Sequence, residues 1–247
     1  MGAPQLAPHP DAFPSALPLQ VDDPVVVAAH DWDAFAAVDE MHNHWNRPGW
    51  STGTRAVYWL LTISDSAFIA HARRCQSLVR HLRFDEIAPD GFHLTLGRVG
   101  IADTLSERQI RNLVATVRAK APPAFALTAI PLTGSRGAFR YSVAPWTPIV
   151  ELHHVLVSSS EACGLPAMTP TARLRPHVGI GYANRTLSAV IARNAVLPLR
   201  SQPSVALRVE TADLVEMRRE SGAYKWRLLH RVRLGTPTPA ASLSPET

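Results

Sequence analysis

Cysteine is scarce in this sequence: its 247 residues include only Cys75 and Cys163. Two cysteines are too few for a disulfide scaffold, and they do not have the spacing of a zinc site. No apolar run approaches the roughly 20 residues that a membrane helix requires. The N-terminus lacks a basic stretch followed by an apolar core, which a secretory signal would need. We therefore expect a cytoplasmic protein that has no membrane attachment.

The sequence also lacks both common glycine-rich phosphate-binding loops, which argues against a nucleotide-binding fold of those types. Charge is unevenly distributed: residues 1–50 carry seven acidic side chains and one basic one, whereas the remaining residues carry 24 basic and 13 acidic ones. A region this basic favours anionic partners such as RNA or nucleotide phosphates. Arginine greatly outnumbers lysine, as in many Ala-, Arg- and Pro-rich sequences, so the charge is supporting evidence only.

Two short segments repeat one pattern of a histidine, an apolar residue, a small residue, an apolar residue and a glycine. The first reads His-Leu-Thr-Leu-Gly from His93 and the second reads His-Val-Gly-Ile-Gly from His177, 84 positions later (177 − 93). Side chains alternate between the two faces of a strand, so Thr95 shares a face with His93 and Gly179 shares one with His177. Each segment thus presents a histidine on a polar face while its apolar residues enter a core.

Two such strands on opposite sides of a cleft would place two imidazoles around one substrate. An unperturbed imidazole pKa of about 6.5 suits both a general acid and a general base at neutral pH. A single histidine in a strand is more often structural. Two histidines that each begin a copy of the same five-residue pattern favour His93 and His177 as a catalytic pair. The alternative is a protein that binds the same ligands without turnover.

The repeated His-x-Thr-x pattern resembles the 2H phosphoesterase superfamily, which includes 2'-5' RNA ligase-like proteins and cyclic phosphodiesterases. The resemblance extends from about Val57 to Leu234 and is specific only at the two motifs. It implies an α+β fold in which two pseudo-symmetric lobes of antiparallel sheet and helices surround a central groove. It further implies catalysis by His93 and His177 and phosphate binding by Thr95, with no metal and no cofactor.

The second motif departs from the family pattern, because Gly179 stands where the family carries Ser or Thr. A missing hydroxyl predicts a partial loss of phosphate binding at this position. Two arginines are candidates to supplement it: Arg175 has the same strand parity as His177, and Arg140 lies on a predicted hairpin strand. Arg98 has the wrong parity to face the groove unless its strand bulges, and we discount it.

We therefore expect a metal-independent phosphodiesterase or RNA ligase-like enzyme that acts on 2',3'-cyclic phosphate or 2'-5' phosphodiester bonds. Its substrates would be RNA ends or nucleotide cyclic phosphates, and no obligate protein partner is evident. The first alternative is an RNA- or nucleotide-binding protein of the same fold with reduced or lost catalysis. The second is an enzyme acting on a small-molecule phosphodiester or a cyclic nucleotide.

Composition divides the chain into three parts. Residues 1–24 hold six prolines and little periodicity, which predicts a disordered arm, and residues 235–247 predict a disordered tail. Residues 25–234 would form the bilobal domain. Within it, the patterns predict strands over 57–63, 92–99, 125–132, 138–143, 205–218 and 224–234, and helices over 66–82, from 106, over 148–163 and over 188–194.

The segment from Met41 to Trp50 concentrates histidine and tryptophan. His42 and His44 have a His-x-His spacing, but no further ligands accompany them at metal-binding distances in sequence, so we do not expect a metal site. We expect the segment to pack over the first lobe through Trp45 and Trp50. Alternatively, His44 or Trp45 lies at the edge of the groove.

Overall fold

The computed structural model describes residues 5–46 and 50–235. The helices are α1 (Pro24–Ala36), α2 (Ser66–Val79), α3 (Glu107–Lys120), α4 (Thr147–Ala162) and α5 (Ala189–Val196). The strands are β1 (Glu40–Met41), β2 (Arg55–Thr62), β3 (Asp85–Glu86), β4 (His93–Ile101), β5 (Phe125–Gly134), β6 (Ala138–Ala144), β7 (His177–Tyr182), β8 (Leu187–Ser188), β9 (Val205–Val209), β10 (Thr211–Glu220) and β11 (Ala223–Arg233).

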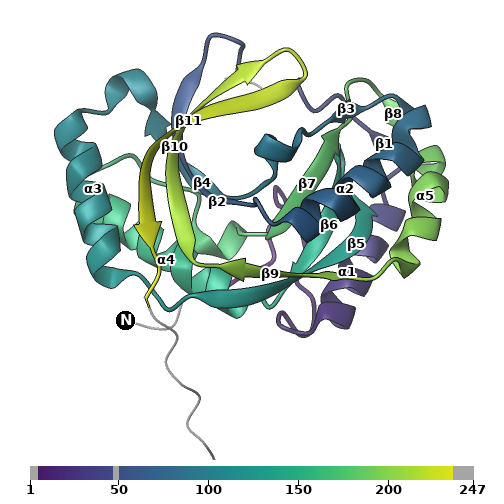
Figure 1. The fold of residues 1–247 in the computed structure, drawn as a ribbon, viewed down its shortest axis with the longest axis horizontal. Helices are drawn as coiled ribbons and strands as arrows, with labels where there is room; N and C mark the ends of the chain where they lie inside the picture. The colour runs from purple at the N-terminus through teal and green to yellow at the C-terminus, as the bar shows by residue number, and fades with distance from the viewer. Residues whose placement is uncertain (1–4, 47–49, 236–247) are drawn as a thin grey trace, which may run out of the picture.

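Two antiparallel sheets organise the molecule (Figure 1). The first sheet has the strand order β11-β10-β2-β4 and the second has the order β3-β7-β6-β5-β9, while β1 and β8 form a small separate ladder. Helices α3 and α4 pack together beside the first sheet, α2 and α5 contact the second, and α1 lies against β5 and β6. The predicted α+β fold with two lobes is therefore confirmed.

The two histidine strands meet where the two sheets approach each other. Strand β4 is an edge of the first sheet, β7 lies next to the short edge strand of the second, and β4 contacts β7. Leu94, Leu96, Val178 and Ile180, the apolar residues of the two motifs, are all buried in one continuous core. Burial of these side chains fixes the register of both strands, because a shift by one residue would bring the histidines into the core.

Strand periodicity did not reveal where the chain changes sheet. We predicted one strand over 205–218, but β9 pairs with β5 in the second sheet and β10 pairs with β2 in the first. The break falls at Glu210, between the two strands. Alternation of side chains continues through this position, and alternation alone carries no information about the partner strand. Helix α1 was also not predicted.

Helix starts follow from side-chain capping. Ser106, where we predicted a helix to begin, is the N-cap of α3 and forms a reciprocal capping box with Gln109. The N-cap of α2 is Asp65 rather than Ser66, because the Asp65 carboxylate accepts a hydrogen bond from the backbone N–H of Phe68 at 2.8 Å. Both residues satisfy amide groups that the helix itself leaves without partners.

Residues 5–23, which we call the N-terminal segment, do not form the disordered arm that their composition predicted. Leu6, Phe13, Leu17 and Val21 pack against the core. The backbone N–H of Trp146 donates to the Val21 carbonyl at 3.1 Å, and the Asp22 carboxylate accepts from the N–H and hydroxyl of Thr147. The composition indicated little regular secondary structure, but contacts with residues distant in sequence hold the segment in place.

At the other end of the chain, the Gly235 N–H donates to the carbonyl of Pro122 at 2.8 Å. The rest of the predicted disordered tail, residues 236–247, lies outside the described residues. Within the part of the chain that the structure describes, no helix has the length and apolar character needed to cross a membrane.

Candidate functional site

A groove of about 630 Å³ lies between the two sheets and brings the two histidine motifs together. Its walls include residues from β2, β4, β10 and β11 on one side and from β6 and β7 on the other. All six residues that the sequence singled out border it: His93, Thr95, Arg140, Arg175, His177 and Gly179. Side chains 84 positions apart in the chain therefore share one concave site.

Both imidazoles are held by the same local hydrogen bond. Nδ1 of His93 lies 2.8 Å from the carbonyl oxygen of Gly91, and Nδ1 of His177 lies 2.8 Å from the carbonyl oxygen of Arg175. A carbonyl oxygen can only accept, so each Nδ1 carries a proton and donates it. In the neutral form, this leaves Nε2 of each ring as the nitrogen with a free lone pair. The sequence repeat thus produces two imidazoles in the same tautomer.

Burial keeps both imidazoles uncharged at neutral pH. Burial lowers the pKa of His93, and the hydrogen bond to Gly91 only partly opposes this effect. Burial also lowers the pKa of His177 to about 3, and the positive charge of Arg140 adds to the shift. Each histidine is therefore ready to accept a proton in the free protein, whereas a proton donor must acquire its proton when an anion enters the groove.

Strand β4 is irregular, and this changes which of its side chains reach the groove. Its pairing with β2 shifts register twice, so exposed side chains recur every third residue, at Thr95 and Arg98, rather than every second one. Arg98 consequently borders the groove, although its parity had led us to discount it. Among the described residues it makes no hydrogen bond or ion pair. Gly97 and Gly100 were the available signal, because glycine within a strand often marks a bulge.

Arg175 does not have the role that its parity predicted. A guanidinium has five N–H donors, and those of Arg175 are committed to backbone carbonyls at 2.8–3.2 Å. The acceptors are Ala7, Pro14, Ser15, Ala172 and Leu174. No donor remains for a phosphate group. Arg175 instead anchors the N-terminal segment beside the groove.

Arg140 is less fully engaged. Its side chain is 2% exposed, its Nη1 donates to the Phe13 carbonyl at 3.3 Å, and its guanidinium lies 5.1 Å from the centre of the Phe13 ring. Nη2 is 3.9 Å from Oδ2 of Asp31, an ion pair without a hydrogen bond. Within the described residues, Nε and Nη2 have no hydrogen-bond partner. Arg140 thus keeps donor capacity at the groove.

Gly179 leaves a small space that a neighbouring side chain partly fills. A Cβ atom built on Gly179 would lie 3.2 Å from Cδ1 of Ile87. A side chain at position 179 would therefore require Ile87 to move by a few tenths of an ångström. The second motif therefore lacks its hydroxyl at a position that the Cδ1 methyl group of Ile87 borders.

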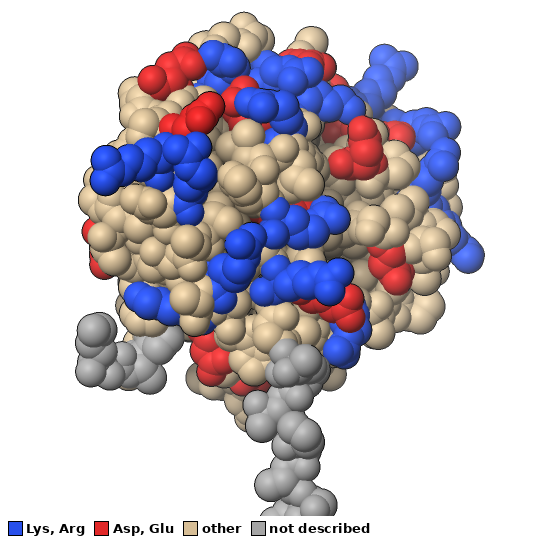
Figure 2. Space-filling view, turned by 60° about the vertical axis from the view of Figure 1, so that its left-hand side comes forward, with Lys and Arg blue, Asp and Glu red and all other residues tan. Residues whose placement is uncertain are grey.

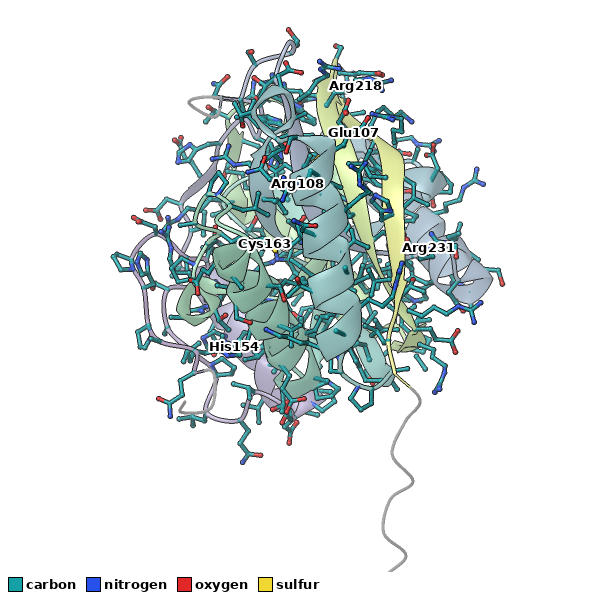
Figure 3. All side chains as sticks on the ribbon, turned by 90° about the vertical axis from the view of Figure 1, so that its left-hand side faces the viewer. Glu107, Arg108, His154, Cys163, Arg218 and Arg231 are labelled. Carbon is teal, nitrogen blue, oxygen red and sulfur yellow. The ribbon has the colours of Figure 1, made fainter. Side chains whose placement is uncertain are left out.

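Two residues at the candidate site were not found from the sequence: Trp226, which contacts His93 without bordering the groove, and His153, which borders it. The Trp226 ring packs edge-on against His93 with 5.1 Å between the ring centres. His153 on α4 is buried beside the groove, its Nδ1 lies 2.9 Å from the hydroxyl of Thr171, and burial lowers its pKa to about 4. Its neighbour His154 lies on the same helix but not at the groove (Figure 3). No local motif surrounds Trp226 or His153, so only the fold identifies them.

In the described part of the histidine- and tryptophan-rich segment, Trp50 packs on the first sheet against Ala56 and Leu60, as expected, whereas His44 and Trp45 reach residues of the second sheet. His44 borders the groove, stacks on Tyr182 of β7 at 4.0 Å and shares a 3.0 Å hydrogen bond with the hydroxyl of Tyr224 on β11. The Trp45 indole N–H donates to Asp85 at 2.7 Å. The placement of His44 at the edge of the groove is therefore confirmed alongside the packing of Trp50 on the first lobe. Among the described residues, no three His, Cys, Asp or Glu side chains are arranged to hold a metal ion.

Comparison with known proteins agrees with this fold. Residues 63–221 match the model of the 2'-5' RNA ligase superfamily. The solved structure of E. coli LigT in complex with 3'-AMP is 16% identical in sequence and has a TM-score of 0.54, with 73% of this chain and 98% of that chain covered. The structure of TT0787 from Thermus thermophilus is 16% identical with a TM-score of 0.55, over 74% of this chain and 100% of that chain. No curated protein matches the chain.

Proposed function

Since the chain belongs to the 2'-5' RNA ligase superfamily, we propose that it is a phosphodiesterase or RNA ligase-like enzyme that uses His93 and His177 as an acid–base pair. Its reaction would be the opening of a 2',3'-cyclic phosphate or the cleavage of a 2'-5' phosphodiester bond, without a metal. One observation carries the proposal: both imidazoles border one groove, and each is fixed by a backbone carbonyl in the tautomer that leaves Nε2 as the acceptor.

In the hydrolytic direction, Nε2 of one neutral histidine takes a proton from water as the water oxygen bonds to phosphorus. The other histidine, protonated once the phosphate has bound, gives its proton to the ribose oxygen as the P–O bond to that oxygen breaks. The lowered pKa suits the base, which must be neutral, whereas the acid depends on the bound anion, which favours the charged form of a neighbouring imidazole. The reverse sequence, with a ribose hydroxyl as the nucleophile, forms the bond.

Phosphate binding is assigned to the groove residues that keep free donors. The Thr95 hydroxyl, on the face of β4 that carries His93, would donate to a non-bridging phosphoryl oxygen. Arg140 supplies positive charge beside His177, and Arg98 adds a second guanidinium on the opposite wall. Gly179 contributes an open backbone position rather than a side chain.

The substrate class is proposed to be RNA ends or nucleotide cyclic phosphates. Aromatic side chains lie at the same groove, among them Tyr58, Tyr182 and Tyr224, and nucleobases stack on aromatic rings. The solved LigT complex contains 3'-AMP, which supports a nucleotide as the ligand of this fold. On the face shown in Figure 2, basic and acidic side chains are interspersed rather than separated, so we place substrate contacts in the groove.

The second candidate function is nucleotide binding with reduced or lost catalysis. Two observations favour it: Gly179 has no hydroxyl, and the pKa of His177 is lowered to about 3, which disfavours a proton donor. Hydrolysis of a nucleoside 2',3'-cyclic phosphate, followed chromatographically in the presence of EDTA, separates the two. Turnover that is lost in His93→Ala and His177→Ala supports the enzyme. Saturable nucleotide binding without turnover supports the binding protein.

A further inference from the structure

A buried carboxylate lies behind the second histidine. Ser142 on β6 is directly opposite His177 on β7 in the sheet register, and its hydroxyl donates to Oδ2 of Asp31 at 2.6 Å. The same oxygen is 3.9 Å from Nη2 of Arg140, two residues earlier on β6. Asp31 is 1% exposed, so its charge depends on these protein groups rather than on solvent. His177, Arg140 and Asp31 thus form one electrostatic group.

The first lobe has a corresponding arrangement with a different charge balance. Thr62 is directly opposite His93, and its hydroxyl donates to Oδ2 of Asp213 at 2.7 Å. Asp213 is also 1% exposed, but it accepts two hydrogen bonds from Arg231, at 2.7 and 2.8 Å. Arg231 lies on β11 at the edge of the face that α3 covers (Figure 3), and its side chain is 53% exposed. The charge of Asp213 is therefore balanced by Arg231, which does not border the groove.

Asp31 has no such partner. Its Oδ1 accepts no hydrogen bond within the described residues, and the nearest cations are Arg140 and, when protonated, His30 at 3.5 Å. Burial raises the pKa of Asp31, but the charge of Arg140, the nearby His30 ring and the hydrogen bond from Ser142 together outweigh burial, so the net shift is downward. The carboxylate is therefore ionised at neutral pH and dependent on a groove arginine.

Asp31 also lies outside the part of the chain that matches the family. It belongs to α1, which precedes residues 63–221 and packs against β5 and β6. The carboxylate thus reaches the groove wall from a helix that is additional to the matched region.

We propose that Asp31 is a positioning residue for the second half of the site: it holds Arg140 opposite Gly179 and supplies the negative charge that lets His177 take up a proton. The kinetic consequence rests on the proposed function, whereas the effect on His177 itself does not.

Besides burial, four groups act on the His177 imidazole. Burial lowers its pKa most, followed by the positive charge of Arg140 on β6; the carbonyl of Arg175 and the carboxylate of Asp31 on α1 raise it, and His93 on β4 lowers it slightly. Removing the Asp31 charge leaves Arg140 uncompensated. The pKa of His177 then falls further, and the protonated imidazole becomes harder to form even with an anion bound.

The direct test is an NMR titration of the histidine side chains of the full chain with saturating sulfate, whose charge is constant across the titration. In Asp31→Asn, the His177 midpoint is expected to shift downward relative to the wild type. Asp213→Asn is the matched control, since it neutralises an equally buried, hydroxyl-bound carboxylate and should leave the His177 midpoint in place. An unchanged His177 midpoint in Asp31→Asn overturns the proposal, whether or not the protein turns over any substrate.

The kinetic arm uses the pH dependence of kcat/KM for a nucleoside 2',3'-cyclic phosphate. If His177 is the acid, Asp31→Asn should move the high-pH limb downward; if it is the base, the low-pH limb should move downward. A profile in which neither limb moves contradicts the proposal. Absence of turnover in the wild type would instead reject the proposed function, and the NMR result would still decide the role of Asp31.

Asp31→Asn leaves Arg140 buried without a counter-charge, which can prevent folding. Ser142→Ala provides a second route, because it retains the carboxylate but removes the hydroxyl donor that favours its ionised form. Asp31 should then protonate at a higher pH, and the His177 midpoint should fall in the same direction by a smaller amount. A His177 midpoint equal to that of the wild type in folded Ser142→Ala counts against the proposal.

Discussion

Arg140 on β6 lies directly opposite Gly179 on β7, so a guanidinium-bearing side chain and a position without a side chain share one face of the second sheet. Directly opposed residues in antiparallel strands project to the same side of the sheet. The second histidine motif therefore has a charged donor next to the place where the first motif has the hydroxyl of Thr95. The two halves of the groove are similar in backbone and unlike in chemistry.

Replacement of either histidine tests the acid–base pair. His93→Ala and His177→Ala should each lower kcat/KM for a nucleoside 2',3'-cyclic phosphate by at least about 100-fold, the lower end for a lost general acid or base. His154→Ala is the control, because His154 lies outside the groove and should retain the wild-type rate. The measurement is steady-state kinetics on variants whose thermal midpoints of unfolding match that of the wild type. A near wild-type rate in either variant would remove that histidine from the mechanism.

The pH dependence of kcat/KM should be bell-shaped and centred below the ordinary imidazole pKa. This parameter reports the free enzyme, in which burial lowers the pKa of both His93 and His177. The base remains neutral to lower pH, and the acid loses its proton at lower pH, so both limbs move in the acid direction. A rate profile from acid to alkaline pH, with circular dichroism to confirm folding, checks this. A bell centred well above neutrality would show that other groups carry the protons.

Deletion of residues 1–16 should destabilise the protein. It removes three of the carbonyl acceptors of the buried Arg175 guanidinium, those of Ala7, Pro14 and Ser15. Donors of a charged group left without acceptors cost about 1–3 kcal/mol each, so we expect a loss of at least about 3 kcal/mol in the free energy of unfolding, measured by urea denaturation. Deletion of residues 236–247 serves as the comparison, and we predict no loss. Equal stability of both truncated proteins would contradict the anchoring role of Arg175.

A hydroxyl at position 179 should help catalysis once space is made for it. Gly179→Ser alone brings Cβ to 3.2 Å from Cδ1 of Ile87, so we combine it with Ile87→Val, which removes that methyl group. The double variant should exceed Ile87→Val in kcat/KM by up to roughly tenfold, the equivalent of about 1.4 kcal/mol. Ile87→Val alone is the matched control and should lose only about 0.5–1.5 kcal/mol of stability. If the folded double variant is slower than this control, position 179 needs a bare backbone.

The histidines could be predicted from the sequence because the repeat places each of them in a short local pattern. The roles of the arginines could not, since they depend on contacts far away in the chain. Arg175 has the parity of His177, yet its partners include carbonyls about 160 positions earlier. Arg98 has the opposite parity from His93, yet the register shift between Thr95 and Gly97 turns it towards the groove. Parity describes an ideal strand, and both exceptions arise where neighbouring elements alter the strand or its surroundings.

The role of Asp31 could not be predicted from the sequence either. In the sequence, Asp31 is followed by Trp32 and Asp33, and nothing distinguishes it from an ordinary acidic residue. The helix that contains it was not predicted. Only the packing of α1 against β6 brings its carboxylate to Ser142 and Arg140. A buried charge is recognised by its partners, and those partners are defined by the fold.

The crossing of the chain at Glu210 means that neither lobe is a contiguous piece of sequence. The first sheet combines β2 and β4 with β10 and β11 from the far end of the chain; of the second sheet, β5, β6, β7 and β9 lie between these pairs in sequence, and β3 lies between β2 and β4. A fragment ending before β9 would therefore lack half of the sheet that supports His93, although it would contain both histidines. Integrity of the groove is in this sense a property of the whole polypeptide: a truncation that removes β10 and β11 would disable the lobe that carries His93.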